Sequence, residues 1–73
     1  MPLLTETGEA LFGPRWQSEL ARALDLNLRT VQRWAVGQGE PPAGVYAELV
    51  LIARERRHAL RGLLPELAKA AGR

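Results

Sequence analysis

The sequence predicts an all-α fold, a bundle of four to five helices in a single domain. Apolar residues recur three and four positions apart in several segments, which is the spacing of one helix face, and turns rich in Gly and Pro separate these segments. Alternation of apolar and polar residues never persists, so no strand is expected. A length of 73 residues allows one domain with a modest core.

A first helix is expected from Leu3 to Phe12. Its apolar face is formed by Leu4, Gly8, Leu11 and Phe12. Gly8 carries no Cβ and would allow another helix to approach closely. Gly13 and Pro14 then break the helix, and Pro14 is suited to begin the next turn.

Two short helices joined by a tight turn are expected between Gln17 and Gly37. Their apolar stripes are Leu20, Ala21 and Leu24 on the first and Val31 and Trp34 on the second. Trp16 precedes the first of them and can pack back on it. Asn27 suits the N-cap of the second, because its side-chain oxygen can accept from a free backbone amide. Gly37 suits the C-terminal stop.

After a loop of turn-forming residues, a long helix is expected from Ala43 to Leu64. Pro65 is expected to kink or end it, with a last short helix following. The apolar positions along this helix include Val45, Leu49, Ile52, Leu60 and Leu63. A basic group occupies other positions: Arg54, Arg56, Arg57 and Arg61, with His58. We interpret this group as a solvated helix face, rather than as a contact to phosphate groups or to acidic residues of a partner subunit.

The composition narrows the class of protein. There is no Cys to form disulfides, no apolar run long enough to span a membrane, and no signal-peptide pattern, so a cytoplasmic protein is expected. The net charge is only +2, but nine of the ten basic residues are Arg and the tenth is Lys69. Arg suits bidentate contacts to phosphate or guanine, although a GC-rich genome would produce the same preference.

The stretch from Gln17 to Gly37 resembles the helix-turn-helix of the Cro-like and lambda-repressor-like DNA-binding proteins of phages and other mobile elements. It matches their pattern at Gln17, Ala21, Leu26, Val31 and Trp34. The resemblance implies that Ala21 must be small because the second helix crosses it closely. It departs at Asp25, where the family usually has a left-handed Gly, and Asp tolerates that backbone conformation better than most residues.

The resemblance implies that the second helix lies in the major groove. The implied base contacts are Leu28, Arg29, Gln32 and Arg33. An Arg can pair bidentately with guanine and a Gln with adenine, while Leu28 can touch a thymine methyl group. The implied phosphate contacts are Gln17, Thr30, Arg15 and Gln38. The free amides at the start of a helix favour an anion.

We therefore expect a sequence-specific regulator of transcription that binds double-stranded DNA, a repressor from a phage or similar mobile element that acts by blocking an operator. One recognition helix reads only about four or five base pairs, so a homodimer on an inverted repeat is expected. The dimer contacts are expected on the long helix, at Val45, Leu49, Ile52, Leu60, Leu63 and Leu64.

Two alternatives stay open. One is a protein-interaction module on the same scaffold (an antitoxin, an inhibitor or a phage assembly factor), which the low net charge favours. The other is an excisionase-like architectural protein that bends DNA. No enzyme, cofactor, small-molecule substrate or membrane partner is expected, because Cys is absent and Ser18 has no nearby His. His58 is a lone histidine, so no metal site is expected.

Overall fold

A computed structural model describes residues 3–72 of the chain. Within these residues the fold is all-α and contains no strand, as the sequence predicts. The elements are α1 (Leu3–Phe12), the short 3-10 helix η1 (Gly13–Arg15), α2 (Trp16–Ala23), α3 (Leu28–Ala35) and α4 (Ala43–Ala71). The predicted limits of the first helix are confirmed, and α2 begins one residue before the predicted start.

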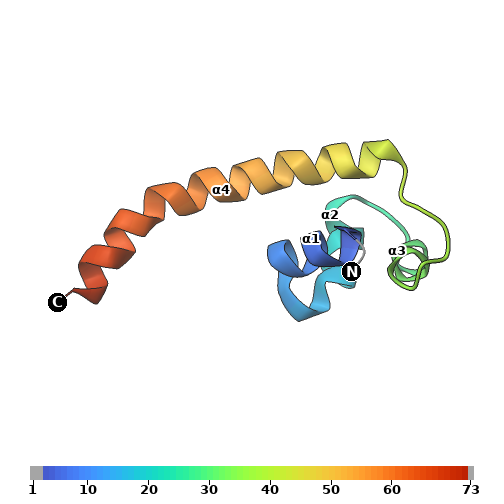
Figure 1. Cartoon of the computed structure of the whole chain (residues 1–73), viewed down its shortest axis with the longest axis horizontal. Helices are drawn as coiled ribbons and strands as arrows, with labels where there is room; N and C mark the ends of the chain where they lie inside the picture. The colour runs from blue at the N-terminus through green and yellow to red at the C-terminus, as the bar shows by residue number, and fades with distance from the viewer. Residues whose placement is uncertain (1–2, 73) are drawn as a thin grey trace.

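Helices α1, α2 and α3 pack together into a compact body, and α4 lies across it (Figure 1). Only the first part of α4 covers the body, and the rest extends beyond it toward the C-terminus (Figure 1). The molecule is accordingly elongated, with extents of 49 × 21 × 21 Å. The all-α class is therefore confirmed, but α4 extends past the body formed by the other three α-helices, so the described residues do not form one compact bundle.

The core consists of a few apolar side chains contributed by all four α-helices. Its buried members are Leu4, Trp16, Leu20, Ala21, Val31, Val45 and Leu49. Gly8 lies against Trp16 so closely that a Cβ at this position would overlap the indole ring. The close helix approach expected at Gly8 is thus confirmed, and its partner is the tryptophan that opens α2.

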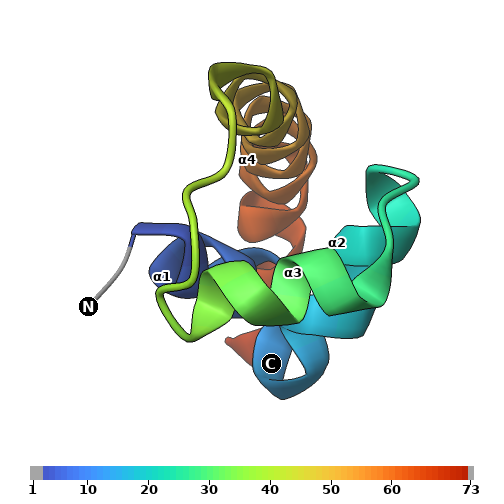
Figure 2. The same cartoon turned by 90° about the vertical axis from the view of Figure 1, so that its right-hand side faces the viewer.

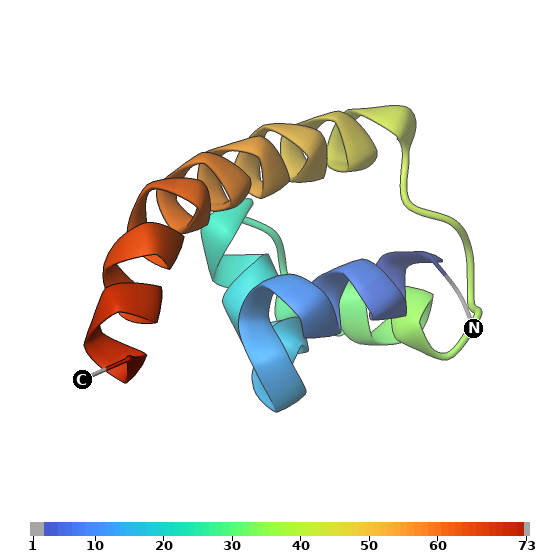
Figure 3. The ribbon, with the colours of Figure 1, turned by 60° about the vertical axis from the view of Figure 1, so that its left-hand side comes forward.

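Helix α4 continues through Pro65 to Ala71, so the prediction of an end at Leu64 followed by a separate short helix is wrong. Proline removes the amide that would bond to the carbonyl of Arg61 and crowds that carbonyl, which strains the helix without always ending it. The helix stays intact here and curves toward the side of the body (Figures 1 and 3). This curvature agrees with a kink at Pro65, which is the other outcome that the sequence predicts.

One arginine fastens α4 to the end of α1. The Nη1 of Arg56 donates to the backbone carbonyl of Leu11 at 2.8 Å, and its guanidinium lies 5.5 Å from the centre of the Phe12 ring. The last carbonyls of a helix lack partners within the helix and carry partial negative charge, so a cation stabilises them. Arg56, which the sequence placed in a solvated basic group, therefore has a structural contact of its own.

Beyond Arg56, α4 makes no side-chain hydrogen bond to the body within residues 3–72. Every residue from Ala53 to Gly72 is exposed, and residues 57–71, which we name the outer half of α4, lie beyond the Arg56 contact. Across residues 3–72, no helix is both long and apolar enough to cross a membrane.

Candidate nucleic-acid interface

The connection between α2 and α3 is a tight turn built from backbone hydrogen bonds. The amide of Leu26 donates to the carbonyl of Ala21 at 2.8 Å, and the amide of Asp25 donates to that of Arg22 at 3.3 Å. This pair of bonds is the Schellman ending of a helix, which needs a left-handed residue at its turn. Asp25 supplies it with φ of 54°, as its position in the sequence predicts.

The start of α3 follows at once. Asn27 has an extended backbone, and its side-chain oxygen accepts from the amide of Arg29 at 2.8 Å. The predicted N-cap is therefore confirmed, and one of the unpaired amides at the start of α3 is satisfied. A helix ended by Asp25 and a helix begun by Asn27 leave no length for a flexible linker, so the turn fixes α3 relative to α2.

The end of α3 repeats the same Schellman ending with a glycine. The backbone amide of Gln38 donates to the carbonyl of Arg33 at 2.8 Å, and the backbone amide of Gly37 donates to the carbonyl of Trp34 at 3.0 Å. Gly37 has φ of 84°. The predicted stop at Gly37 is confirmed. Helix α3 is thus held at both ends by local hydrogen bonds, which gives its side chains defined positions.

Helices α2 and α3 meet through their predicted apolar stripes. Leu20 and Val31 are fully buried, and Ala21 is only 4% exposed. Trp34 is half-buried and packs against this core, so it is a core residue and not a stacking platform. The small side chain of Ala21 is what allows α3 to pack closely against α2.

The opposite face of α3 is open. The four residues expected to contact bases, Leu28, Arg29, Gln32 and Arg33, are all exposed. They share one face because they follow a spacing of i, i+1, i+4 and i+5. Val36 continues this face at i+8 and is 72% exposed, although it is not among the base contacts predicted from the sequence. Its spacing of four from Gln32 is the signal that could have identified it.

The basic groups on this face are not neutralised by carboxylates. Within residues 3–72 the one ion pair joins Arg22 and Glu19 at 3.7 Å, on the exposed side of α2. The guanidinium groups of Arg29 and Arg33 therefore face solvent without an acidic partner, in the part of the chain that the structure describes. Such groups are available to bind an anion or a base edge.

The residues expected to contact phosphates lie in three separate places. Arg15 is exposed in η1, and Gln17 is half-buried in the first turn of α2. Thr30 is half-buried on α3, and Gln38 is exposed beyond its far end. Figure 2 shows α3 along the front of the body, with α4 receding behind it. The four residues thus lie on or around α3 and do not form one cluster.

The residues expected at a dimer contact divide into two groups. Val45 and Leu49 are 8% and 3% exposed within a single chain, so their assignment to a dimer surface is wrong. Their apolar stripe already packs against the body, as does the half-buried Ile52. The remaining three, Leu60, Leu63 and Leu64, are 50–61% exposed in the outer half of α4.

Comparison with protein-family models, with curated proteins and with solved structures finds no match to this chain. Within residues 3–72, no group of three or more His, Cys, Asp or Glu side chains gathers as metal ligands would. The geometry of α2, the turn and α3 is consequently the main indication of function.

Proposed function

We propose that this protein is a sequence-specific regulator that binds double-stranded DNA and reads it with α3. The observation that carries the proposal is the exposed face of α3, a helix fixed at both ends. Within residues 3–72, Arg29 and Arg33 on this face have no carboxylate partner, and Gln32 lies exposed between them. An α-helix fits the major groove of B-DNA, and these residue types are the ones that recognise base edges there.

The proposal includes a helix-turn-helix of the lambda-repressor-like kind formed by α2, the turn and α3. It is supported by the left-handed Asp25, the N-cap at Asn27 and the buried Ala21. In this arrangement α2 lies across the groove and the N-terminal part of α3 enters it. Arg15 and Gln17, at the start of α2, then lie where a phosphate would meet the positive end of that helix.

Each side chain on the open face has a separate role in this proposal. Arg29 donates two hydrogen bonds to a guanine, and Gln32 makes the equivalent pair with an adenine. Leu28 touches a thymine methyl group, while Arg33 contacts a second guanine or a phosphate. None of these contacts needs a catalytic group, so regulation follows from occupancy: a protein seated on an operator excludes polymerase and represses the gene.

The regulator is proposed to act as a dimer on an inverted repeat. One recognition helix contacts about four or five base pairs, and two copies related by a two-fold axis double the length of sequence that is read. A helix-turn-helix of this kind suits a regulator carried by a phage or similar mobile element.

Selection of bound duplexes from a random library tests the proposal directly, and an inverted repeat should be enriched. Replacing Arg29 by Ala should then relax the preference at one position of each half-site and weaken specific binding by about 1–3 kcal/mol. Arg54→Ala, which removes the same charge from an exposed position on α4, is the matched control and should leave the selected sequence unchanged.

Other results separate the competing functions. Equal weakening on all sequences by Arg29→Ala would make Arg29 a phosphate contact, with a correspondingly smaller dependence of affinity on salt. Retention of DNA without any motif would indicate an architectural binder. Failure of the folded protein to retain any duplex would overturn the proposal and favour a protein-interaction module.

A further inference from the structure

The outer half of α4 carries an apolar stripe that stays mostly exposed within residues 3–72. Its members are spaced alternately by three and four residues: Leu60, Leu64, Leu67 and Ala71. The three leucines are 56%, 61% and 59% exposed. A regular spacing of three and four is the pattern by which one helix packs along another. Most of the stability of a helix in a protein comes from packing of its amphipathic face, so an exposed stripe of this kind favours packing against a partner helix.

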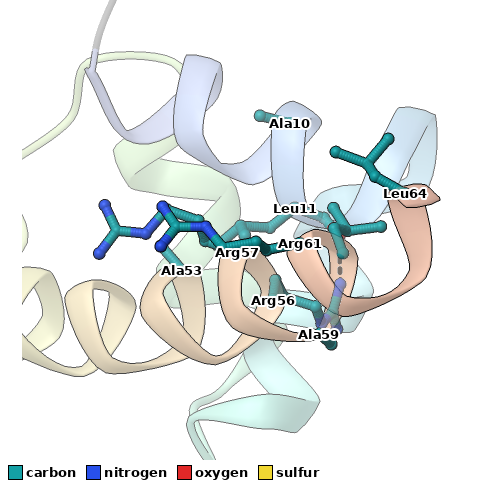
Figure 4. Close-up of a pocket in the computed structure, with 9 residues that line it drawn as sticks. Ala10, Leu11, Ala53, Arg56, Arg57, Ala59, Arg61 and Leu64 are labelled. Atoms are coloured by element: carbon teal, nitrogen blue, oxygen red, sulfur yellow. Dashed lines mark hydrogen bonds between the residues drawn. The ribbon is translucent and has the colours of Figure 1, made fainter.

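The stripe leads into a groove between α1 and α4. This α1–α4 groove, with a volume of about 670 Å³, is lined on one side by Ala10 and Leu11 and on the other by residues of α4 that include Leu60 and Leu64 (Figure 4). The hydrogen bond from Arg56 to Leu11 joins the two sides of the groove (Figure 4). The small side chains of Ala10, Ala53 and Ala59 leave the groove wide.

The groove also carries two cations. Arg57 and Arg61 both line it, and neither has a carboxylate partner within the part of the chain that the structure describes. An apolar groove with two guanidinium groups suits the C-terminal end of an amphipathic helix, whose last carbonyls carry partial negative charge. The chain itself contains such an end, since α4 presents Leu67 and Ala71 in its last turns.

We infer that the α1–α4 groove and the apolar stripe form a homodimer interface, in which the outer half of α4 from a second copy packs antiparallel to the first. Each copy inserts its Leu67 and Ala71 beside Leu60 and Leu64 of the other, and the end of each helix approaches Arg57 and Arg61 of the other. The surface is self-complementary, as a two-fold interface requires.

Charge selects the antiparallel arrangement. Arg57 belongs to the same stripe, three residues before Leu60. In a parallel, in-register pair, the two copies of Arg57 would face each other within the interface, where like charges repel and desolvation is costly. The antiparallel pair moves each Arg57 to the carbonyl end of the partner helix, where a cation is stabilising.

This inference rests on the dimer in the proposed function, and its test contains no DNA. Sedimentation velocity at micromolar concentrations should show a dimer of the wild-type chain. Leu64→Asp should weaken the association by roughly 30-fold or more, because it places a charge in the middle of the stripe. Since Leu64 is exposed within one chain, the body should keep its helical content by circular dichroism.

Leu51→Asp is the matched control. Leu51 is 58% exposed on α4 but lies outside the stripe and the groove, so this variant should remain dimeric. A monomeric wild-type chain would overturn the inference, as would equal weakening by Leu51→Asp and Leu64→Asp. A monomer that still selects a DNA motif would overturn the proposed dimer but would leave the proposal that α3 reads DNA intact.

The direction of packing has its own measurement. The structure contains no Cys, so a single nitroxide label can be attached at Glu48→Cys, near the start of α4. An antiparallel overlap of the outer halves places the two labels more than roughly 40 Å apart, from a rise of 1.5 Å per residue. A parallel pair places them within roughly 20 Å, because packed helix axes lie 8–10 Å apart. The short distance would overturn the antiparallel arrangement.

Discussion

The two parts of α4 share an apolar helical periodicity but have different surroundings. Between Val45 and Arg56, an apolar stripe packs on the body and ends in a hydrogen bond to α1. Beyond Arg56, leucines recur at the same helical spacing, yet all of them are exposed. Helical periodicity in the sequence therefore identifies an apolar face that can be buried. Which part of that face the chain itself buries depends on where its other helices lie.

The largest expected effect is on the packed side of this comparison. Leu49→Ala, at a side chain of α4 that is only 3% exposed, should lower the free energy of unfolding by about 2–5 kcal/mol, because it leaves a cavity in a small core. Leu67→Ala, made in the Leu64→Asp background to keep the chain monomeric, should change it by less than about 1 kcal/mol. Urea denaturation measures both, and similar losses would contradict the division of α4.

Much of the body could be predicted from the sequence, because its signals are local. The limits of α1, the cap at Asn27, the left-handed Asp25 and the stop at Gly37 each depend on residues within one turn. These signals also fix which face of α3 is open, since the apolar stripe defines the opposite face.

The errors concern contacts between distant segments. The sequence predicts Val45 and Leu49 at a dimer contact because it does not reveal that they join the buried core of the same chain. The role of Arg56 depends on the carbonyl of Leu11, which is 45 residues away in the chain. The continuation of α4 through Pro65 reflects a balance between the strain at one residue and the hydrogen bonds on both sides, which no local pattern determines.

A second test applies one substitution to two glycines. Gly8→Ala should destabilise the protein by about 1–3 kcal/mol, because the new methyl group would overlap the ring of Trp16. Gly62→Ala should stabilise the outer half of α4 by up to about 1 kcal/mol, because nothing lies near its Cβ position and Ala favours a helix. Thermal unfolding of the two variants should move in opposite directions; a shift of the same sign would show that Gly62 has a contact of its own.

The smallest expected effect is at the turn before α3. Asn27→Ala should cost about 1 kcal/mol, because the amide of Arg29 loses its acceptor. Asn27→Ser keeps an acceptor and should cost much less. Hydrogen exchange at the start of α3 checks this locally, and faster exchange should appear in the Ala variant. Unchanged exchange would mean that the turn holds α3 without its cap.

The curvature and length of α4 have a consequence for DNA. In the proposed dimer, α4 is the spacer between two reading helices, so it determines both their separation and their relative rotation about the spacer axis. One residue inserted into α4 between Arg56 and Arg57, just before the outer half, would add about 1.5 Å of length in each copy and turn each reading helix by about 100° about its own α4 axis. Seven inserted residues, close to two full turns, would nearly restore the angle. The length of α4 therefore sets both the distance between the two reading helices and their relative rotation. The spacing between half-sites in a selected operator would report both quantities.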